Sequence, residues 1–278
     1  MKFSVWQTSI AVLEFMRQER RLVARYGALP LILSFVVKLA VGGLVAALTL
    51  KGEGAMDNTT NAAILLAQSA AQLIILLPVT VFCLRLSVIG EDAAAGRPIF
   101  QIGRVEWQFL RLQLKAMAGY LGILAIIVGG ALLLSRPGER GQPIFTILAL
   151  LWLIGGAVGI LMVLMRISMA FVASALDQPM TFRQSWNITR GYGWRLLGAN
   201  GLLAIAGVAI YLLFLLVGFI FGAAGVIVSA QKLQGVLAGL QLVGSSLANF
   251  LILLATATLF GFVYRMLIAP PASAESPN

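Results

Sequence analysis

The chain contains no histidine and a single cysteine, Cys83, among its 278 residues. Without histidine there is no imidazole to bind haem, zinc or copper, and no Ser–His or Cys–His catalytic pair. A lone cysteine forms no internal disulfide bond. These absences favour a protein that is not an enzyme and that needs no cofactor.

Charged residues are also scarce, at 11% of the chain, while hydrophobic residues make up 60% and the mean hydropathy is +0.97. A soluble domain carries about 25% charged residues, so this surface is expected to face lipid. Apolar runs of about 20 residues recur, which is the length of a membrane-spanning helix. The runs are continuous rather than alternating, which argues against a β-barrel. The sequence therefore predicts an all-α polytopic membrane protein.

Six apolar runs predict six transmembrane helices, with amphipathic helices in the interface between them. The spans are expected at 27–50, 62–89, 117–134, 144–165, 196–228 and 236–268. We assign 1–26 to an N-terminal interfacial helix, 27–269 to the transmembrane domain and 270–278 to a flexible tail. The alternative for the N-terminal helix is that it packs on the protein's own spans. No apolar core precedes Glu14, so we expect no cleavable signal peptide.

The orientation follows from the basic residues, which gather on the cytoplasmic side of membrane proteins. With six spans, fifteen lysines and arginines fall on the side of the termini and four on the other side, with Lys38 left inside a span. We therefore expect both termini in the cytoplasm. The same bias accounts for the net charge of +10 without any nucleic-acid partner.

An internal repeat is suggested by two similar stretches 81 residues apart. Arg85, Ser87 and Pro98 align with Arg166, Ser168 and Pro179, and each proline precedes an amphipathic segment and a new span. Arg265 ends the last span as Arg85 and Arg166 end the second and fourth. The pattern predicts a threefold pseudo-repeat of parallel topology, unlike the inverted repeats of many transporters.

Lys38 is the sharpest candidate for a ligand-binding group, because a charge inside a membrane helix is costly without a partner. Gln68 and Gln72 are four residues apart and share a helix face. We predict that these three residues bind an anionic lipid or another anion. The alternative is that Lys38 extends along a crevice towards the interface. Asn249 and Thr256 are expected to join helices by hydrogen bonds.

A second cluster of candidates lies at the predicted cytoplasmic interface. Aromatic and arginine residues favour docking of a protein partner or an anionic phospholipid, although such residues are also common at any membrane interface. One further face of the segment before the third span is polar and basic. Asp177 is interpreted as a turn or helix-start residue. The predicted docking residues are Arg85, Arg166, Trp186, Arg190, Trp194 and Arg195, and the basic face consists of Gln101, Arg104, Gln108, Arg111 and Lys115.

The run Asp177-Gln178-Pro179, followed by Ser185-Trp186-Asn187-Ile188-Thr189-Arg190-Gly191, resembles uncharacterised bacterial six-helix inner-membrane proteins. These include a group similar to the membrane domain of glycerophosphoryl diester phosphodiesterases. The resemblance covers about fifteen residues and implies a bacterial inner-membrane protein. It carries over no catalytic residue, because the chain lacks the histidines and the soluble domain of such an enzyme.

Two functions remain open from the sequence. The first is a non-enzymatic scaffold, assembly or accessory protein that acts through its basic, aromatic cytoplasmic face, with anionic phospholipids and a larger membrane protein complex as partners. The second is a transporter or lipid-handling protein that binds an anionic amphiphile at Lys38. Few polar groups fall within the spans, which favours the first.

Overall fold

The structure is a computed structural model that describes residues 4–50, 58–90, 102–138, 143–178, 180–224 and 230–268. Over these ranges the chain is α-helical and has no strand, which confirms the predicted all-α class. The eight helices are α1 (Val5–Gln18), α2 (Arg20–Leu50), α3 (Asn58–Ile89), α4 (Arg104–Gly138), α5 (Pro143–Ala175), α6 (Phe182–Ile188), α7 (Gly193–Ala224) and α8 (Ala230–Ile268).

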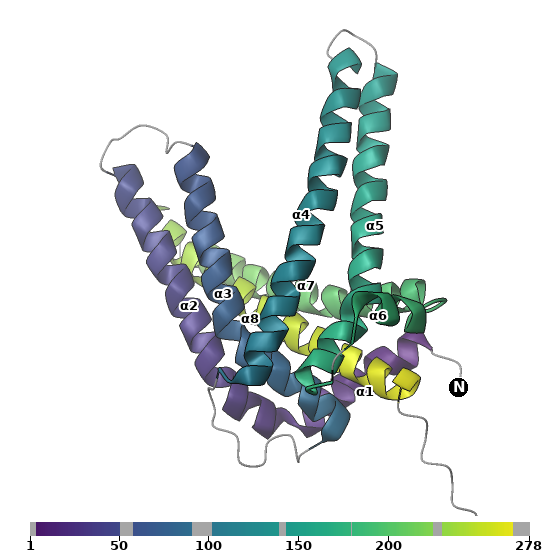
Figure 1. The fold of residues 1–278 in the computed structure, drawn as a ribbon. Helices are drawn as coiled ribbons and strands as arrows, with labels where there is room; N and C mark the ends of the chain where they lie inside the picture. The colour runs from purple at the N-terminus through teal and green to yellow at the C-terminus, as the bar shows by residue number, and fades with distance from the viewer. Residues whose placement is uncertain are drawn as a thin grey trace, which may run out of the picture. The chain divides into compact units, whose positions relative to one another are not determined.

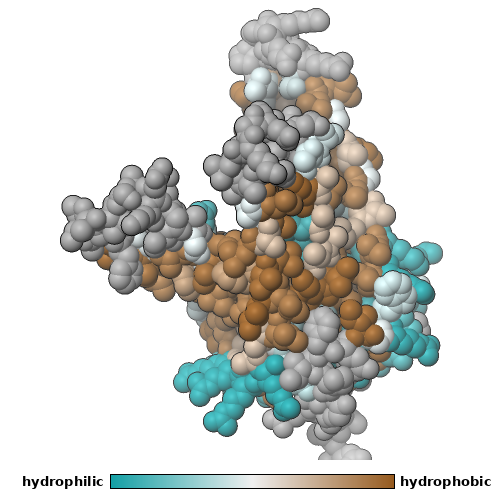
Figure 2. Space-filling model, turned by 90° about the vertical axis from the view of Figure 1, so that its left-hand side faces the viewer, coloured by the Kyte–Doolittle hydropathy of each residue, from teal (hydrophilic) through white to brown (hydrophobic). Residues whose placement is uncertain are grey.

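Six of these helices are long and apolar enough to cross a membrane, within the residues described. Their candidate spans are Arg20–Val45, Ala62–Ile89, Arg104–Ser135, Ile144–Ala175, Gly193–Ile220 and Gly239–Ile268. Each overlaps one predicted span, so the protein is a multi-pass membrane protein. Figure 2 shows one face, on which apolar side chains cover much of the surface and hydrophilic ones gather at its edges.

The chain divides into two compact units. One unit, here called the α1–α3 unit, contains most of α1, helices α2 and α3, α7 from Asn200 and α8 up to Val263. The other, here called the α4–α6 unit, contains α4, α5 and α6 with the start of α7 and the end of α8 from Tyr264.

In the α1–α3 unit, α2 and α3 form an antiparallel hairpin (Figure 1), in which the rings of Tyr26 and Phe82 stack at 4.1 Å. Helix α8 packs against α3 at Gly261, where an added Cβ would fall on the Ser87 hydroxyl. A close approach of this kind requires glycine. Helix α1 is fixed to the same unit by Phe15, whose ring lies 5.3 Å from that of Phe262.

Helix α1 has one buried face, and several of its large apolar side chains are exposed. Thr8 and Val12 are buried, whereas Trp6 is 65% exposed and Leu13 is exposed as well. One face of the helix thus packs on the protein, and its exposed apolar side chains lie on another face.

Helices α7 and α8 run antiparallel within the α1–α3 unit. The Thr256 hydroxyl lies 2.8 Å from the side-chain oxygen of Asn200 and donates to it. This hydrogen bond confirms that Thr256 joins two helices. Asn249, predicted to do the same, is exposed.

In the α4–α6 unit, α4 and α5 form the second hairpin (Figure 1). One tryptophan of α5 forms a hydrogen bond to α4. The Trp152 indole N–H donates to the carbonyl of Ile127 at 2.9 Å. Gly130 makes room for the ring, since an added Cβ would lie 2.7 Å from the indole nitrogen. Gly156 packs on Ile127 in the same way.

The helix ends differ from the sequence prediction. Helix α2 begins at Arg20, before residue 27 at which the first span was expected to start. Helix α4 begins at Arg104, where the Glu106 carboxylate accepts from the Gly103 N–H at 2.9 Å, and it continues into the span without a break. Helix α5 likewise continues beyond Arg166 to Ala175. The polar segments before the third span and after the fourth are therefore continuous with the membrane helices. The predicted tail, residues 270–278, lies outside the described residues.

The predicted repeat has a local counterpart. Ser87 and Ser168 are both buried, and each hydroxyl donates to the carbonyl three residues earlier, at 2.9 Å to Leu84 and 2.7 Å to Met165. The aligned Arg85 and Arg166 are both half-buried. Matching residues thus have matching surroundings, whereas Pro98 and Pro179 lie outside the described residues.

Candidate functional site

The first candidate site is built on α6, a helix of seven residues that is too short to be stable alone. Thr181 caps it: its hydroxyl accepts from the Gln184 N–H at 3.2 Å, and the Gln184 side chain accepts from the Thr181 N–H at 2.8 Å. This capping box has the signature T-x-x-Q, which the sequence displays and which could have located the helix start.

Two buried hydroxyls attach α6 to α5. Ser185 Oγ donates to the carbonyl of Arg166 at 2.7 Å and accepts from the Ala170 N–H at 3.3 Å. It therefore bridges two backbone groups that pair with each other in a regular α-helix. Thr189 Oγ1 lies 3.1 Å from the same Arg166 carbonyl oxygen and 2.8 Å from that of Ser185. Both hydroxyl residues are fully buried, so α6 is held as a rigid part of α5.

The side chain of Arg166 supports the outer surface of α6. Its guanidinium carbon lies 4.1 Å from the ring centroid of Trp186, which is a cation–π contact. Gly191 then turns the chain with φ of +90°, a conformation that favours glycine. An added Cβ at Gly193 would lie 3.6 Å from Arg166 Cγ, so α7 starts directly beside the arginine.

This arrangement brings five of the six predicted docking residues into one unit. We call them the docking face: Arg166, Trp186, Arg190, Trp194 and Arg195. Trp194 is 66% exposed and Trp186 38% exposed, while Arg190 and Arg195 are exposed too. The sixth, Arg85, lies near the end of α3 in the α1–α3 unit and is half-buried. A fixed surface of tryptophan and arginine suits binding of an acidic partner.

A polar groove lies in the same unit, with a volume of about 680 Å³. It is formed by the basic face of α4, the end of α5 and the start of α6. The groove is lined by Arg104, Gln108, Arg111, Leu112, Lys115, Ser174, Asp177, Gln178, Met180, Thr181 and Gln184. The sequence had indicated the basic face of α4 but not the residues opposite it.

Asp177 provides the acidic side of this groove and confirms its interpretation as a turn residue. The Gln178 N–H bonds the carbonyl of Ala173, and the Asp177 N–H bonds that of Ser174, which ends α5 in a Schellman motif. Asp177 has φ of +58° there. With the Gln108 amide turned, that side chain donates to Asp177 at 3.1 Å and accepts from Arg104 Nε at 3.2 Å.

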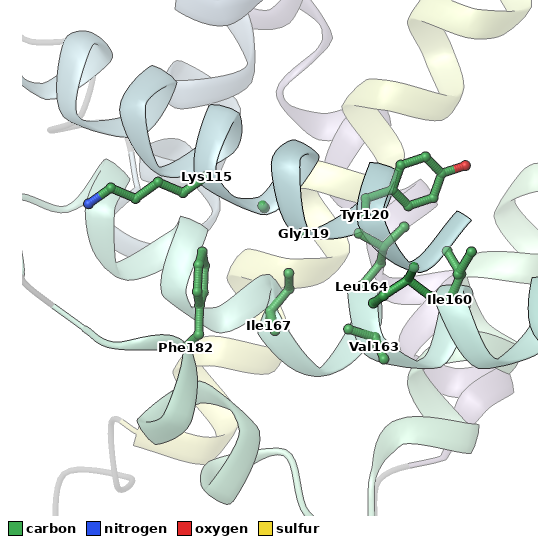
Figure 3. A pocket seen from close by; sticks show the side chains of 10 residues that line it. Lys115, Gly119, Tyr120, Ile160, Val163, Leu164, Ile167 and Phe182 are labelled. Atoms are coloured by element: carbon green, nitrogen blue, oxygen red, sulfur yellow. The ribbon is translucent and has the colours of Figure 1, made fainter. Parts of the chain in front are cut away.

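An apolar slot of about 220 Å³ adjoins the groove, and the two share Lys115. The slot lies between α4 and α5, and Phe182 of α6 also contributes to its lining. Its lining is Lys115, Ala116, Gly119, Tyr120, Ile123, Ile160, Val163, Leu164, Ile167 and Phe182. In Figure 3 the Lys115 ammonium points away from the apolar end of the slot.

The predicted anion site consists of residues on α2 and α3. Lys38 lies in α2, and Gln68 and Gln72 lie in α3, the two helices of one hairpin. No hydrogen bond joins Lys38 to either glutamine. The Gln72 side-chain nitrogen is buried without a hydrogen-bond partner among the described residues.

No protein family, curated protein sequence or solved structure matches the chain.

Proposed function

We propose that this protein is a non-enzymatic scaffold or accessory protein of the bacterial inner membrane, with both termini in the cytoplasm. Its docking face binds an acidic surface of a partner membrane protein complex. The orientation is supported by the distribution of basic residues in the sequence, and the membrane by the resemblance of residues 177–191 to bacterial proteins.

The observation that carries the proposal is the attachment of α6 to α5. Ser185 and Thr189 both reach the Arg166 carbonyl, while the Arg166 side chain holds Trp186 in place. A surface held this way loses little conformational entropy when a partner binds. Tryptophan and arginine are also the residues that most often dominate the binding energy of protein interfaces.

The test is a charge reversal on the docking face. We expect the double variant Arg190→Glu and Arg195→Glu to lose a stoichiometric protein partner that native mass spectrometry detects on the wild type in lipid nanodiscs. The matched control reverses Arg17 near the end of α1 and Arg21 at the start of α2, which are also exposed and lie four residues apart in the sequence. Retention of the partner by the folded double variant would refute the proposal, as would a wild type that carries no protein partner.

A second function is favoured by the buried, unpaired nitrogen of Gln72. It and Lys38 are both donors and lie in the two helices of one hairpin, which suits an anionic amphiphile bound by both. In this alternative the protein transports or handles that amphiphile. Loss of a bound anionic lipid in both Lys38→Met and Gln72→Leu would select this function, and retention in both variants would exclude it.

A further inference from the structure

We propose that the polar groove and the apolar slot together form a binding site for one anionic phospholipid of the surrounding bilayer. The phosphate lies among Arg104, Arg111 and Lys115, and one acyl chain enters the slot. The site is separate from the docking face and does not depend on the proposed scaffold function.

The charge of the groove selects an anion. Three of its lining residues are cationic and only Asp177 is acidic. Neither Arg111 nor Lys115 forms an ion pair in the part of the chain that the structure describes. Arg111 is instead placed over the Trp107 ring at 5.5 Å, which leaves its N–H groups available to a phosphate.

The slot explains why the ligand is an amphiphile and not free phosphate. Apart from Lys115 its lining is apolar or aromatic, and it adjoins the groove at Lys115. Its volume of about 220 Å³ is below the roughly 300–1,000 Å³ of pockets for whole small molecules. It therefore holds only part of a ligand, such as a segment of an acyl chain.

Lys115 connects the two halves. Its hydrocarbon stem lines the slot, while its ammonium points away from the slot's apolar end (Figure 3). A long basic side chain at a membrane boundary takes this posture because the stem is apolar and the head is charged. A lipid whose chain lies in the slot would place its phosphate beside that ammonium.

The wall of the slot is held by aromatic packing. Phe171 of α5 lies 5.7 Å from Phe109 of α4 and 6.3 Å from Phe182 of α6, measured between ring centroids. These contacts pack Phe182, which lines the slot, against Phe171 of α5.

The test compares how much phosphatidylglycerol the wild type and its variants retain. Each protein is reconstituted in phosphatidylcholine nanodiscs with added phosphatidylglycerol, and the bound lipids are counted by native mass spectrometry. We expect retention to fall about tenfold or more in Arg104→Gln with Arg111→Gln, because charge-assisted hydrogen bonds to phosphate are lost. Gly119→Leu should cause a similar loss, because a side chain there extends into the slot.

Gly122→Leu is the matched control. An added Cβ at Gly119 or Gly122 meets nothing within 4 Å, both residues lie on α4, and only Gly119 lines the slot. Unchanged retention in Gly119→Leu, or equal loss in both leucine variants, would overturn the site. Displacement of the lipid by excess inorganic phosphate would also overturn it, since the chain would then contribute nothing.

The outcome is independent of the docking-face experiment. Arg190 and Arg195 line neither the groove nor the slot, so their reversal should leave phosphatidylglycerol bound. If the arginine variants of α4 fail to fold, Gly119→Leu and its control still decide the proposal.

Discussion

Removing the two hydroxyls that hold α6 should detach it from α5 without disturbing the membrane helices. Ser185→Ala deletes one hydroxyl, and Thr189→Val replaces the other with a methyl group of similar size. Both residues are fully buried, and both hydroxyls reach the Arg166 carbonyl at 2.7 and 3.1 Å.

The magnitude follows from the number of hydrogen bonds lost. One neutral hydrogen bond contributes about 1 kcal/mol net. In either single variant the carbonyl keeps the other hydroxyl, so we expect a loss of about 1 kcal/mol or less. The double variant loses both bonds, about 2 kcal/mol in all, and leaves α6 held mainly by side-chain packing. Since both hydroxyls share one acceptor, the loss in the double variant should be at least the sum of the two single losses.

Trypsin provides the assay, because Arg183 and Arg190 lie in and just after α6 and are cleaved when the segment opens. Under conditions in which opening and closing are fast, the cleavage rate follows the population of the open state. A loss of about 2 kcal/mol therefore predicts cleavage about thirtyfold faster in the double variant, and about fivefold faster in each single one.

Ser69→Ala serves as the control. Its hydroxyl also bonds a backbone carbonyl, at 2.8 Å to Leu65, but it lies exposed on α3 and joins no second helix. Its cleavage pattern should equal that of the wild type. If the double variant were cut after Arg183 or Arg190 no faster than this control, the two hydroxyls would not hold α6, and the rigid docking face would lose its physical basis.

Three further predictions concern stability, measured by thermal unfolding in nanodiscs. Gly261→Ala should destabilise the protein by about 1–3 kcal/mol, because its methyl group meets the buried Ser87, whereas Gly239→Ala on the same helix has open space and should be neutral or slightly stabilising. Lys38→Met should raise the melting temperature, because it removes a charge that costs roughly 3 kcal/mol of free energy at the centre of a membrane helix. A lower melting temperature would show that Lys38 has a structural partner. Asp177→Gly should also stabilise, by about 1 kcal/mol, because glycine suits the φ of +58° and removes a negative charge from the C-terminus of α5; no gain would mean that the Gln108 contact outweighs both effects.

The six spans could be predicted because the length and continuity of apolar runs are local properties of the sequence. The helix ends could not be, because α4 and α5 continue through polar residues that the sequence assigned to separate interfacial segments. The helix face used for packing is a tertiary property as well. Gly155 and Gly159 have the spacing typical of helix contacts, yet an added Cβ at either meets nothing within 4 Å, and their neighbour Gly156 packs on Ile127.

The candidate sites show the same division between local and tertiary information. Arginine and tryptophan at a polar boundary are visible in the sequence, and five of six predicted docking residues do share one unit. The function of Ser185 could not be predicted, because its partner is a carbonyl 19 residues earlier in the chain. The basic face of α4 was visible too, but Asp177 and Gln184 face it only because α5 ends in a Schellman motif and α6 folds back on α5.

Helix α6 belongs to both proposed sites, and this has a thermodynamic consequence. Thr181, Phe182 and Gln184 line the groove or the slot, while Trp186 belongs to the docking face. A ligand that binds only the docked form of α6 stabilises that form, so each site would be occupied more readily when the other is filled. The coupling is reciprocal and equals at most the free energy of undocking α6. In the wild type α6 is already docked and the coupling should be small; in the Ser185→Ala and Thr189→Val double variant it should become measurable, with phosphatidylglycerol slowing tryptic cleavage of α6 more than it does in the wild type.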